Sequence, residues 1–317
     1  IADDSDDFNR WQAASTYATR LLLCSAASIR EGSAPAHDKD FSATLKKLVE
    51  KDTDPAFTAQ ILTLPSEADI AREKGEDVDP DAIHLARESL RQAIGGDLKE
   101  TLVSTYESLA GEGAYSPDAL AAGRRCLRNA ALDLFAAGHV VEGAQLAKRQ
   151  FDQASTMTDK IAALAVLTHI EGDERETALE AFYQQYESEP LVIDKWFALQ
   201  ASIPEEGTLN RVKSLMGHKA FTFSNPNRMR ALVGAFAAQN QTRFNALDGS
   251  GYDFVAGIVL ELDPKNPQVA ARLLSAFKSW RSLEAQRRAL TERALRQVAA
   301  AASLSPDVKD IVGRSLA

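Results

Sequence analysis

The chain contains 317 residues, of which 45% are hydrophobic and 26% are charged, and its formal net charge is −9. This composition is typical of a folded protein with ample material for a core, and it excludes an intrinsically disordered chain. The acidic balance argues against nucleic-acid and acidic-membrane partners, because both require a clustered basic surface.

Features of an oxidising or membrane environment are missing from the sequence. Cys24 and Cys126 are the two cysteines, and they are far apart and without metal-ligand spacing. A disulfide framework is therefore not expected, and a reducing, cytoplasmic compartment is favoured. No apolar run reaches the length of about 18 residues that a membrane span needs, and no secretory segment opens the sequence. The sequence begins with Ile1 and not Met, so we expect it to be part of a longer protein.

Apolar residues at helical spacing start near the beginning of the chain. The first predicted helix covers Phe8 to Ser28. The next helices are expected to begin at four polar or proline-containing sites, Asp40 or Ser42, Asp54-Pro55, Pro65-Ser66 and Asp79-Pro80. Ser66 and Asp69 form a predicted capping box for the third of these.

Glycines and prolines mark the predicted helix ends and starts in the next part of the sequence. The helix that starts at Pro80 is expected to end near Gly95-Gly96, and Leu98 to Leu109 forms the next one. Gly111 to Gly113 then breaks the pattern, and Pro117 is expected to be the first residue of the following helix.

The rest of the sequence predicts only helices and short turns. The predicted helices cover residues 117–137, 139–153, 158–170, 173–187, 189–203, 205–217, 226–238, 241–246, 252–262, 267–278, 282–301 and 305–316. No stretch of useful length alternates with the period of a strand. The sequence therefore predicts an all-α fold of antiparallel helix pairs with short connections.

One helix opening occurs twice between Ser224 and Phe277. Asn225-Pro226 and Asn266-Pro267 are 41 residues apart, and each pairs a capping Asn with a Pro at the first helical position. Each is followed by an apolar stripe at helical spacing, formed by Met229, Leu232, Val233 and Phe236 in the first copy and by Ala270, Leu273, Leu274 and Phe277 in the second. A repeat of this length is typical of an α-solenoid, so we expect a right-handed, HEAT/armadillo-like superhelix that forms one domain over residues 1–317.

The side of the two helices opposite the stripe is the candidate functional face. Asn227 and Arg230 lie there in the first copy, and Gln268 and Arg272 lie there in the second. A guanidinium beside a capped helix start forms a positive region suited to carbonyl or carboxylate groups. The other reading is that these arginines are ordinary helix surface, because an exposed Arg usually makes only a weak surface ion pair.

Motifs for independent catalysis are missing. The sequence has no HExxH, and His37, His84, His139, His169 and His218 have no second His or Cys at ligand spacing. Gly249-Ser250-Gly251 is too short for a phosphate-binding loop and is better explained as a turn. The sequence therefore predicts no metal site, no cofactor and no catalytic residue within this chain.

Eight segments, taken in order along the chain, resemble the C-terminal domain of bacterial aminopeptidase N, a zinc metallo-aminopeptidase of the HExxH…E class. The four in the first half are Asp7-Phe8-Asn9-Arg10-Trp11, Ile61-Leu62-Thr63-Leu64-Pro65-Ser66, Leu127-Arg128-Asn129 and Met157-Thr158-Asp159. The four in the second half are Asp194-Lys195-Trp196-Phe197-Ala198-Leu199-Gln200, Phe223-Ser224-Asn225-Pro226-Asn227-Arg228, Asp248-Gly249-Ser250-Gly251-Tyr252 and Asn266-Pro267-Gln268-Val269-Ala270.

The resemblance implies a role without catalysis. In this family the zinc site lies in an earlier thermolysin-like domain of the same polypeptide, and the helical domain closes over it to form a chamber for short peptides. The resemblance assigns substrate contacts to Gln268, Arg272 and Arg230, with Asn225 and Asn266 as the supporting helix caps. The expected partners are the catalytic domain of the same polypeptide and short peptides, with zinc held only in that other domain.

Two alternatives remain. A free-standing HEAT-like scaffold would bind a protein partner along its concave face. A hydrolase with an unrecognised site of its own is the third possibility, and no group of residues in the sequence supports it.

Overall fold

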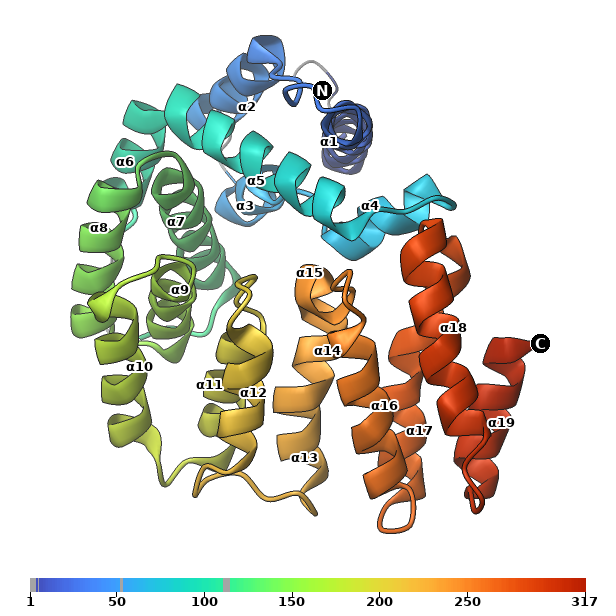
Figure 1. Ribbon diagram of the computed structural model, residues 1–317. Coiled ribbons are helices and arrows are strands. Elements are labelled where there is room, and N and C mark those ends of the chain that lie inside the picture. Colours follow the sequence, from blue (N-terminus) through green and yellow to red (C-terminus); the bar gives the residue numbers. More distant parts are fainter. Residues whose placement is uncertain (1–3, 5, 52–53, 111–114) are drawn as a thin grey trace. The chain divides into compact units, whose positions relative to one another are not determined.

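The computed structural model describes residue 4 and residues 6–51, 54–110 and 115–317, and these are helical almost throughout (Figure 1). Within these ranges the only β-type pairing outside helices is an isolated parallel bridge between Val78 and Leu283. The prediction of an all-α fold is therefore confirmed. The chain divides into two compact units, one made of Ile1–Glu73 and Ala82–Glu180 and the other of Lys74–Asp81 and Ala181–Ala317. They are called unit 1 and unit 2 below.

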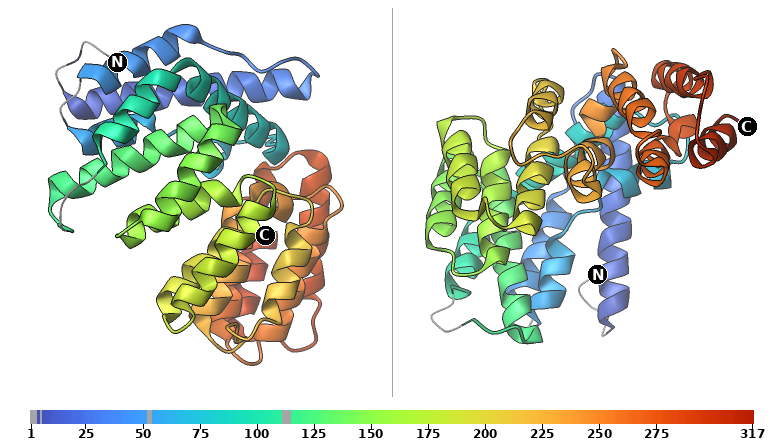
Figure 2. Two further views of the ribbon diagram at one scale, coloured as in Figure 1. Left: turned by 90° about the vertical axis from the view of Figure 1, so that its left-hand side faces the viewer. Right: turned by 90° about the horizontal axis from the view of Figure 1, so that it is seen from below.

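Unit 1 is built around one long central helix, α7. Its helices are α1 (Asp7–Arg30), α2 (Lys39–Lys51), α3 (Pro55–Leu62), α4 (Glu67–Lys74) up to Glu73, α5 (Pro80–Asp97) from Ala82 onward, α6 (Lys99–Ser108), α7 (Ala119–Gly138), α8 (Val140–Gln153), α9 (Met157–Thr168) and the first part of α10 (Asp173–Tyr186). Helices α3, α6, α8 and α9 all contact α7, and Figure 2 shows these neighbours from two further directions. Ala131 and Leu132 of α7 are fully buried as a result.

Two glycines allow α5 and α7 to approach backbone to backbone. Helix α5 ends at Asp97, so its predicted end near Gly95-Gly96 is confirmed. A Cβ at Gly95 would lie 2.1 Å from the carbonyl oxygen of Leu134, and a Cβ at Gly138 would lie 2.4 Å from the carbonyl carbon of Gly95. Gly95 and Gly138 therefore allow a close helix crossing in the last turn of α5.

The start of α7 differs from the expectation. The helix begins at Ala119 and not at Pro117, because Asp118 is the N-cap and its side chain accepts the Ala121 N–H at 2.9 Å. The predicted capping box is present at α4, where the Ser66 hydroxyl accepts the Asp69 N–H at 3.2 Å and donates to the Asp69 carboxylate at 2.6 Å. The predicted break at Gly111 to Gly113 lies outside the described residues.

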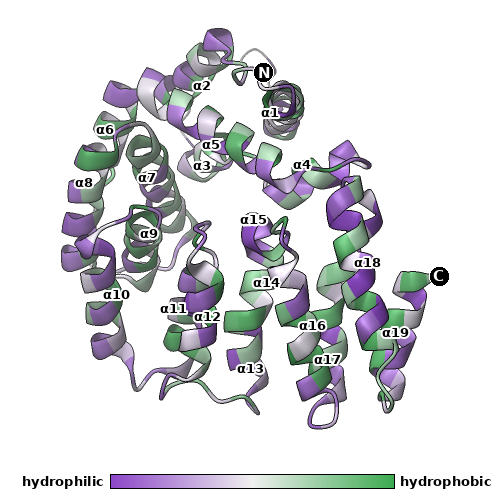
Figure 3. Ribbon diagram, in the orientation of Figure 1, coloured by the Kyte–Doolittle hydropathy of each residue, from purple (hydrophilic) through white to green (hydrophobic). Residues whose placement is uncertain are grey.

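Unit 2 is a series of shorter helices packed side by side. They are α11 (Pro190–Ala201), α12 (Thr208–Met216), α13 (Pro226–Met229), a π-helical turn η1 (Arg230–Gly234), α14 (Ala235–Gln239), α15 (Gln241–Phe244), α16 (Ser250–Leu262), α17 (Pro267–Leu274), the 3-10 turns η2 (Ser275–Phe277) and η3 (Trp280–Ser282), α18 (Ala285–Ala299) and α19 (Pro306–Leu316). Hydrophobic residues run along the helices of both units and do not gather in one segment (Figure 3). This distribution is expected when each helix buries one stripe.

Four helices of unit 2 start with proline and start at the same edge. Helices α11, α13, α17 and α19 each have Pro at the first helical position, and all begin at the lower edge of unit 2 in Figure 1. The two Asn-Pro openings are thus the middle members of a longer series that also includes Glu189-Pro190 and Ser305-Pro306.

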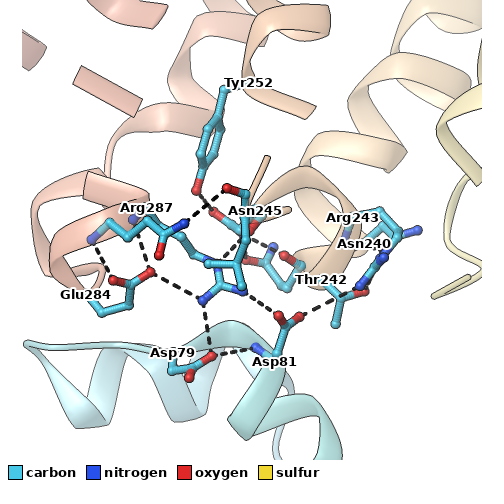
Figure 4. A network of polar contacts seen from close by, with 12 residues as sticks. Asp79, Asp81, Asn240, Thr242, Arg243, Asn245, Tyr252, Glu284 and Arg287 are labelled. Atoms are coloured by element: carbon cyan, nitrogen blue, oxygen red, sulfur yellow. Dashed lines mark hydrogen bonds and ion pairs between the residues drawn. The ribbon is translucent and has the colours of Figure 1, made fainter. Parts of the chain in front are cut away.

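A buried arginine fastens the segment Lys74–Asp81 to the rest of unit 2 (Figure 4). Arg287 of α18 is 2% exposed, and its guanidinium bonds to Asp79 at 3.2 Å, to Asp81 and to the carbonyl oxygen of Asn245 at 2.6 Å. Backbone bonds extend this attachment, since the Val78 N–H donates to Ser282 and the Glu284 N–H donates to Val78. Unit 2 is therefore assembled from two stretches of chain that are remote in sequence.

Candidate functional site

The first Asn-Pro motif opens a continuous helical stretch from Pro226 to Gln239. The Asn225 side chain is the N-cap and accepts the N–H groups of Asn227 at 2.9 Å and Arg228 at 3.4 Å. The apolar stripe beneath is buried as predicted, with Met229, Leu232, Val233 and Phe236 all at 0% exposure.

Arg228 belongs to the core of unit 2. It is 7% exposed and donates to the carbonyl oxygens of Ala220 and Pro190, each at 2.8 Å, and to the carboxylate of Asp194. Its guanidinium also lies 5.7 Å from the centre of the Phe197 ring. All of these partners are within unit 2, so Arg228 joins the start of α13 to α11 and to the segment before α13.

Arg230, two residues later, is exposed. Its guanidinium donates to the side-chain oxygen of Asn227, which is also exposed. Arg230 is the first residue of the π-helical turn η1, in which the helix widens by one residue per turn. Such turns recur at functional sites, where they change the direction in which a side chain leaves the helix.

The second Asn-Pro motif has the same capped start. The Asn266 side chain accepts the Val269 N–H at 3.3 Å, and Pro267 follows it. Gln268 and Arg272 are both exposed on α17. Beneath them Ala270, Leu273 and Leu274 are buried, so the stripe of this copy also faces inward.

The helices of the two motifs are neighbours. A Cβ placed on Gly234 of η1 would lie 3.9 Å from Cδ2 of Leu273 on α17, and η1 and α17 are in contact. Arg230, Gln268 and Arg272 are therefore exposed side chains of two packed helices that start at the same edge of unit 2 (Figure 1). We call these three side chains the candidate face.

The arginines of the candidate face differ from most exposed arginines of unit 2. Arg293, Arg296 and Arg314 each form an ion pair with a carboxylate. Within the described part of the chain, Arg272 has no hydrogen-bond or ion-pair partner for its guanidinium, and Arg230 contacts only the neutral Asn227. Guanidinium groups in this state are available to a carbonyl or carboxylate group of a ligand.

Comparison with known proteins identifies the family. The family model described as "Domain of unknown function (DUF3458_C) ARM repeats" matches residues 1–317. The chain belongs to this family of ARM-repeat domains. The predicted helical-repeat fold is confirmed by this match and by the helices described above.

Curated relatives of this ARM-repeat domain carry the name aminopeptidase N. The chain is 39% identical to the Caulobacter vibrioides protein over all of its length and 35% identical to the Escherichia coli protein over 98% of its length. It spans only 36% of each of these proteins, in their C-terminal region. The predicted resemblance to the C-terminal domain of bacterial aminopeptidase N is confirmed.

A solved structure has the same fold. Aminopeptidase A of Legionella pneumophila, crystallised in complex with aspartic acid, superposes on 99% of this chain with a TM-score of 0.88 and 26% sequence identity. The matched region is 37% of that protein.

The histidines of the ARM-repeat domain have local structural roles. His218 packs against Tyr183 with ring centres 4.8 Å apart, and its Nδ1 accepts the Ala220 N–H at 3.1 Å. His84 contacts Glu67 at 2.7 Å; burial lowers the pKa of His84, but the hydrogen bond and charge of Glu67 raise it by more, so that the pKa lies above its usual value. No group of three or more His, Cys, Asp or Glu side chains among the residues that the structure describes is placed to hold a metal ion.

Two other sequence features have simple structural explanations. Gly249, with φ +77°, is the turn residue before α16, and Gly251 lies against the backbone of Phe244, where a Cβ would approach to 2.3 Å. A left-handed turn therefore accounts for Gly249, and close packing of α16 accounts for Gly251. None of the helices in the described ranges is long and apolar enough to span a membrane.

Proposed function

We propose that this chain is the non-catalytic C-terminal helical domain of a zinc aminopeptidase that removes N-terminal residues from peptides. The domain covers the active-site chamber of the same polypeptide, restricts access to short peptides and supplies substrate-positioning residues. The observation that carries this proposal is the candidate face, whose exposed arginines lack carboxylate partners within the described chain. Nearly the whole of this chain matches proteins named aminopeptidase N, and this match supports a role in peptide hydrolysis.

The candidate face positions the substrate through hydrogen bonds and takes no part in the covalent chemistry. Arg230 and Arg272 bind carbonyl or carboxylate groups of the residues after the scissile bond, where a planar guanidinium can donate two hydrogen bonds at once. Gln268 contributes to the pocket for the first side chain. Holding an extended peptide in this way lowers the entropic part of the barrier for the reaction.

Zinc belongs to a different part of the polypeptide in this proposal. The described residues of this chain offer no set of ligands for it. Zinc in the catalytic domain supplies an activated water molecule for attack on the first peptide bond. The whole enzyme is proposed to act in the cytoplasm, since Cys24 and Cys126 are free thiols.

The kinetic test uses the full-length polypeptide with Arg230→Ala and Arg272→Ala. A tripeptide has carbonyl and carboxylate groups after the scissile bond, whereas an alanyl arylamide has none. We expect kcat/KM for the tripeptide to fall about 10- to 100-fold in each variant, because a hydrogen bond to a charged group contributes about 1.5–3 kcal/mol. Hydrolysis of the arylamide is expected to change much less.

Arg288→Ala is the matched control for this test. Arg288 is also exposed and has no hydrogen-bond or ion-pair partner within the described ranges, but it lies in α18, away from both motifs. Its removal is expected to leave both substrates unaffected. Equal loss on tripeptide and arylamide in the Arg230 and Arg272 variants, or no loss at all, would reject the positioning role.

The alternative of a free-standing scaffold makes the opposite prediction. A scaffold would bind a protein partner through unit 2 without any peptidase in the same polypeptide. The match of the chain to about a third of much longer aminopeptidases favours the enzyme domain.

A further inference from the structure

Helix α1 buries small residues and exposes aromatic ones, the reverse of the usual pattern. Ala14, Ala18 and Leu22 are 1–3% exposed, whereas Phe8 is 63% and Trp11 37% exposed. Burying an aromatic side chain removes about 150–250 Å² of surface from water. The helix therefore leaves a large part of the Phe8 surface and a smaller part of the Trp11 surface in water.

The exposed rings continue the buried stripe of α1. At 100° per residue, Phe8, Trp11, Ala18 and Leu22 lie on one side of the helix. Leu22 and Ala18 are covered by the rest of unit 1, and the cover ends toward the first turn of the helix. The stripe is therefore covered at Ala18 and Leu22, partly covered at Trp11 and mostly uncovered at Phe8.

The two rings form one patch. Their centres are 5.9 Å apart with an angle of 42° between the planes. Trp11 also borders a shallow crevice that it shares with Ile61, in the last turn of α3, and with Leu64 and Pro65, just after α3. The apolar surface thus extends from the first turn of α1 to a second element of unit 1.

Polar groups border this patch and are held in place. The Arg10 guanidinium lies 4.7 Å from the centre of the Phe57 ring and donates to the Asp7 carboxylate at 3.0 Å. Asp6 caps α1 by accepting the Asn9 N–H at 3.0 Å. An apolar centre with an ordered polar border is the anatomy of a protein interface.

The greater length of the relatives indicates which partner covers the patch formed by Phe8 and Trp11. The chain spans 36% of the curated aminopeptidase N sequences and corresponds to their C-terminal region, so in those relatives most of the polypeptide precedes the matched region. A segment joined to the chain just before α1 is present at a high effective concentration, which favours it over any separate partner.

We propose that the first two turns of α1, with Phe8 and Trp11 at their centre, are the surface on which the preceding part of the same polypeptide docks. This inference rests on the proposed function for the identity of that part, a catalytic domain. It adds the location of the contact, an apolar patch on unit 1 that is separate in sequence from the candidate face of unit 2.

The test places a photo-reactive benzophenone amino acid at Gln12 in the full-length polypeptide. Gln12 is exposed one helical turn after Phe8, so a group docked on the rings is within its reach. The expected result is a cross-link within one chain, from position 12 to a peptide that precedes residue 1 of the present sequence. A cross-link between two chains, or no cross-link beyond the domain, would overturn the proposal.

Hydroxyl-radical labelling of the same polypeptide supplies the second measurement. Tyr115 is the matched control for Phe8, because their side chains are aromatic and are 66% and 63% exposed in the domain. We expect labelling of Phe8 and Trp11 to be lost while Tyr115 remains labelled, after correction for intrinsic reactivity. Labelling of Phe8 at the rate of a free aromatic ring would reject docking at this patch.

Failure of this proposal can be distinguished from failure of the proposed function. Cross-linking and labelling measure docking without any substrate, whereas the tests of Arg230 and Arg272 measure peptide turnover. A cross-link to the preceding segment together with unchanged kinetics would keep the docking surface and reject the positioning role.

Discussion

Two arginines of one motif, Arg228 and Arg230, have opposite environments although they are two residues apart. They flank the apolar stripe at about 100° on either side of Met229, so helical periodicity alone does not distinguish them. The distinction comes from Asp194 and Pro190 of α11, which bind Arg228 from more than 30 residues away. The sequence pattern could identify the motif but not which arginine the core would use.

Removal of Arg228 is expected to destabilise unit 2. Arg228→Ala leaves the Asp194 carboxylate, which is 18% exposed, without its partner and removes one hydrogen-bond donor from each of the Ala220 and Pro190 carbonyl groups. Breaking a buried pair in this way costs about 3–5 kcal/mol of unfolding free energy. Urea denaturation measures it, with Arg230→Ala as the control, for which a change within about 0.5 kcal/mol is expected. Similar stability of the two variants would contradict the assignment of Arg228 to the core.

His84 is expected to make the stability of unit 1 depend on pH. Burial lowers its pKa, but the hydrogen bond to Glu67 and the charges of Glu67 and Glu88 raise it above 6.5 overall. Because the folded pKa is the higher one, the stabilisation is complete below pH 6.5 and is lost as pH rises through the folded pKa. The thermal midpoint of the wild type should therefore fall relative to that of His84→Gln between about pH 6 and pH 8. Parallel curves for the two proteins would show that the ion pair contributes nothing.

At the scale of helices, local signals were sufficient for most of the fold. Asn225-Pro226, Asn266-Pro267 and the Ser66 capping box act within one turn, so the sequence reveals them directly. The close approach of Gly95 to Leu134 and Gly138 involves a second helix, α7, and the sequence revealed neither this approach nor the π-helical turn at Arg230. A pattern read along one segment contains no information on these contacts.

Adjacent glycines of α5 give a matched test of the helix crossing. Gly95→Ala would place a methyl group against the backbone of α7 and is expected to cost about 1–3 kcal/mol or more of unfolding free energy. Gly96→Ala meets nothing within 4 Å and is expected to stabilise the helix by about 0.5–1 kcal/mol. Thermal denaturation of the two variants should therefore shift in opposite directions. A loss for both would mean that α5 needs glycine for flexibility and not for close approach.

At the scale of the whole molecule, the chain passes from unit 1 into unit 2 at Lys74–Asp81, returns at Ala82 and enters unit 2 again within α10. The sequence predicted one solenoid and did not indicate that the segment Lys74–Asp81 belongs to unit 2. Helical spacing describes segments separately, while the pairing of Asp79 and Asp81 with Arg287 joins residues more than 200 positions apart. The single domain over residues 1–317 stays a prediction.

The two carboxylates of the segment Lys74–Asp81 are expected to stabilise its attachment to α18. Replacing Asp79 and Asp81 with Asn leaves the buried Arg287 with Glu284 as its remaining carboxylate partner, so the segment Lys74–Asp81 should detach more often from α18. Hydrogen exchange should become faster at the Val78 and Glu284 amides, which bridge the two stretches, and in the first turns of α18. The amides of α7 in unit 1 should keep their wild-type rates.

Asp253→Asn is the control, because Asp253 also binds an arginine of α18, Arg293, but both side chains are about half exposed. An exposed pair of this kind contributes less than about 1 kcal/mol, so exchange in α18 should not change. If the two sets of variants gave the same exchange pattern, the buried position of Arg287 would have no part in joining the segment to unit 2. Faster exchange confined to the Asp79 and Asp81 variant would instead show that unit 2 depends on carboxylates supplied by the segment Lys74–Asp81.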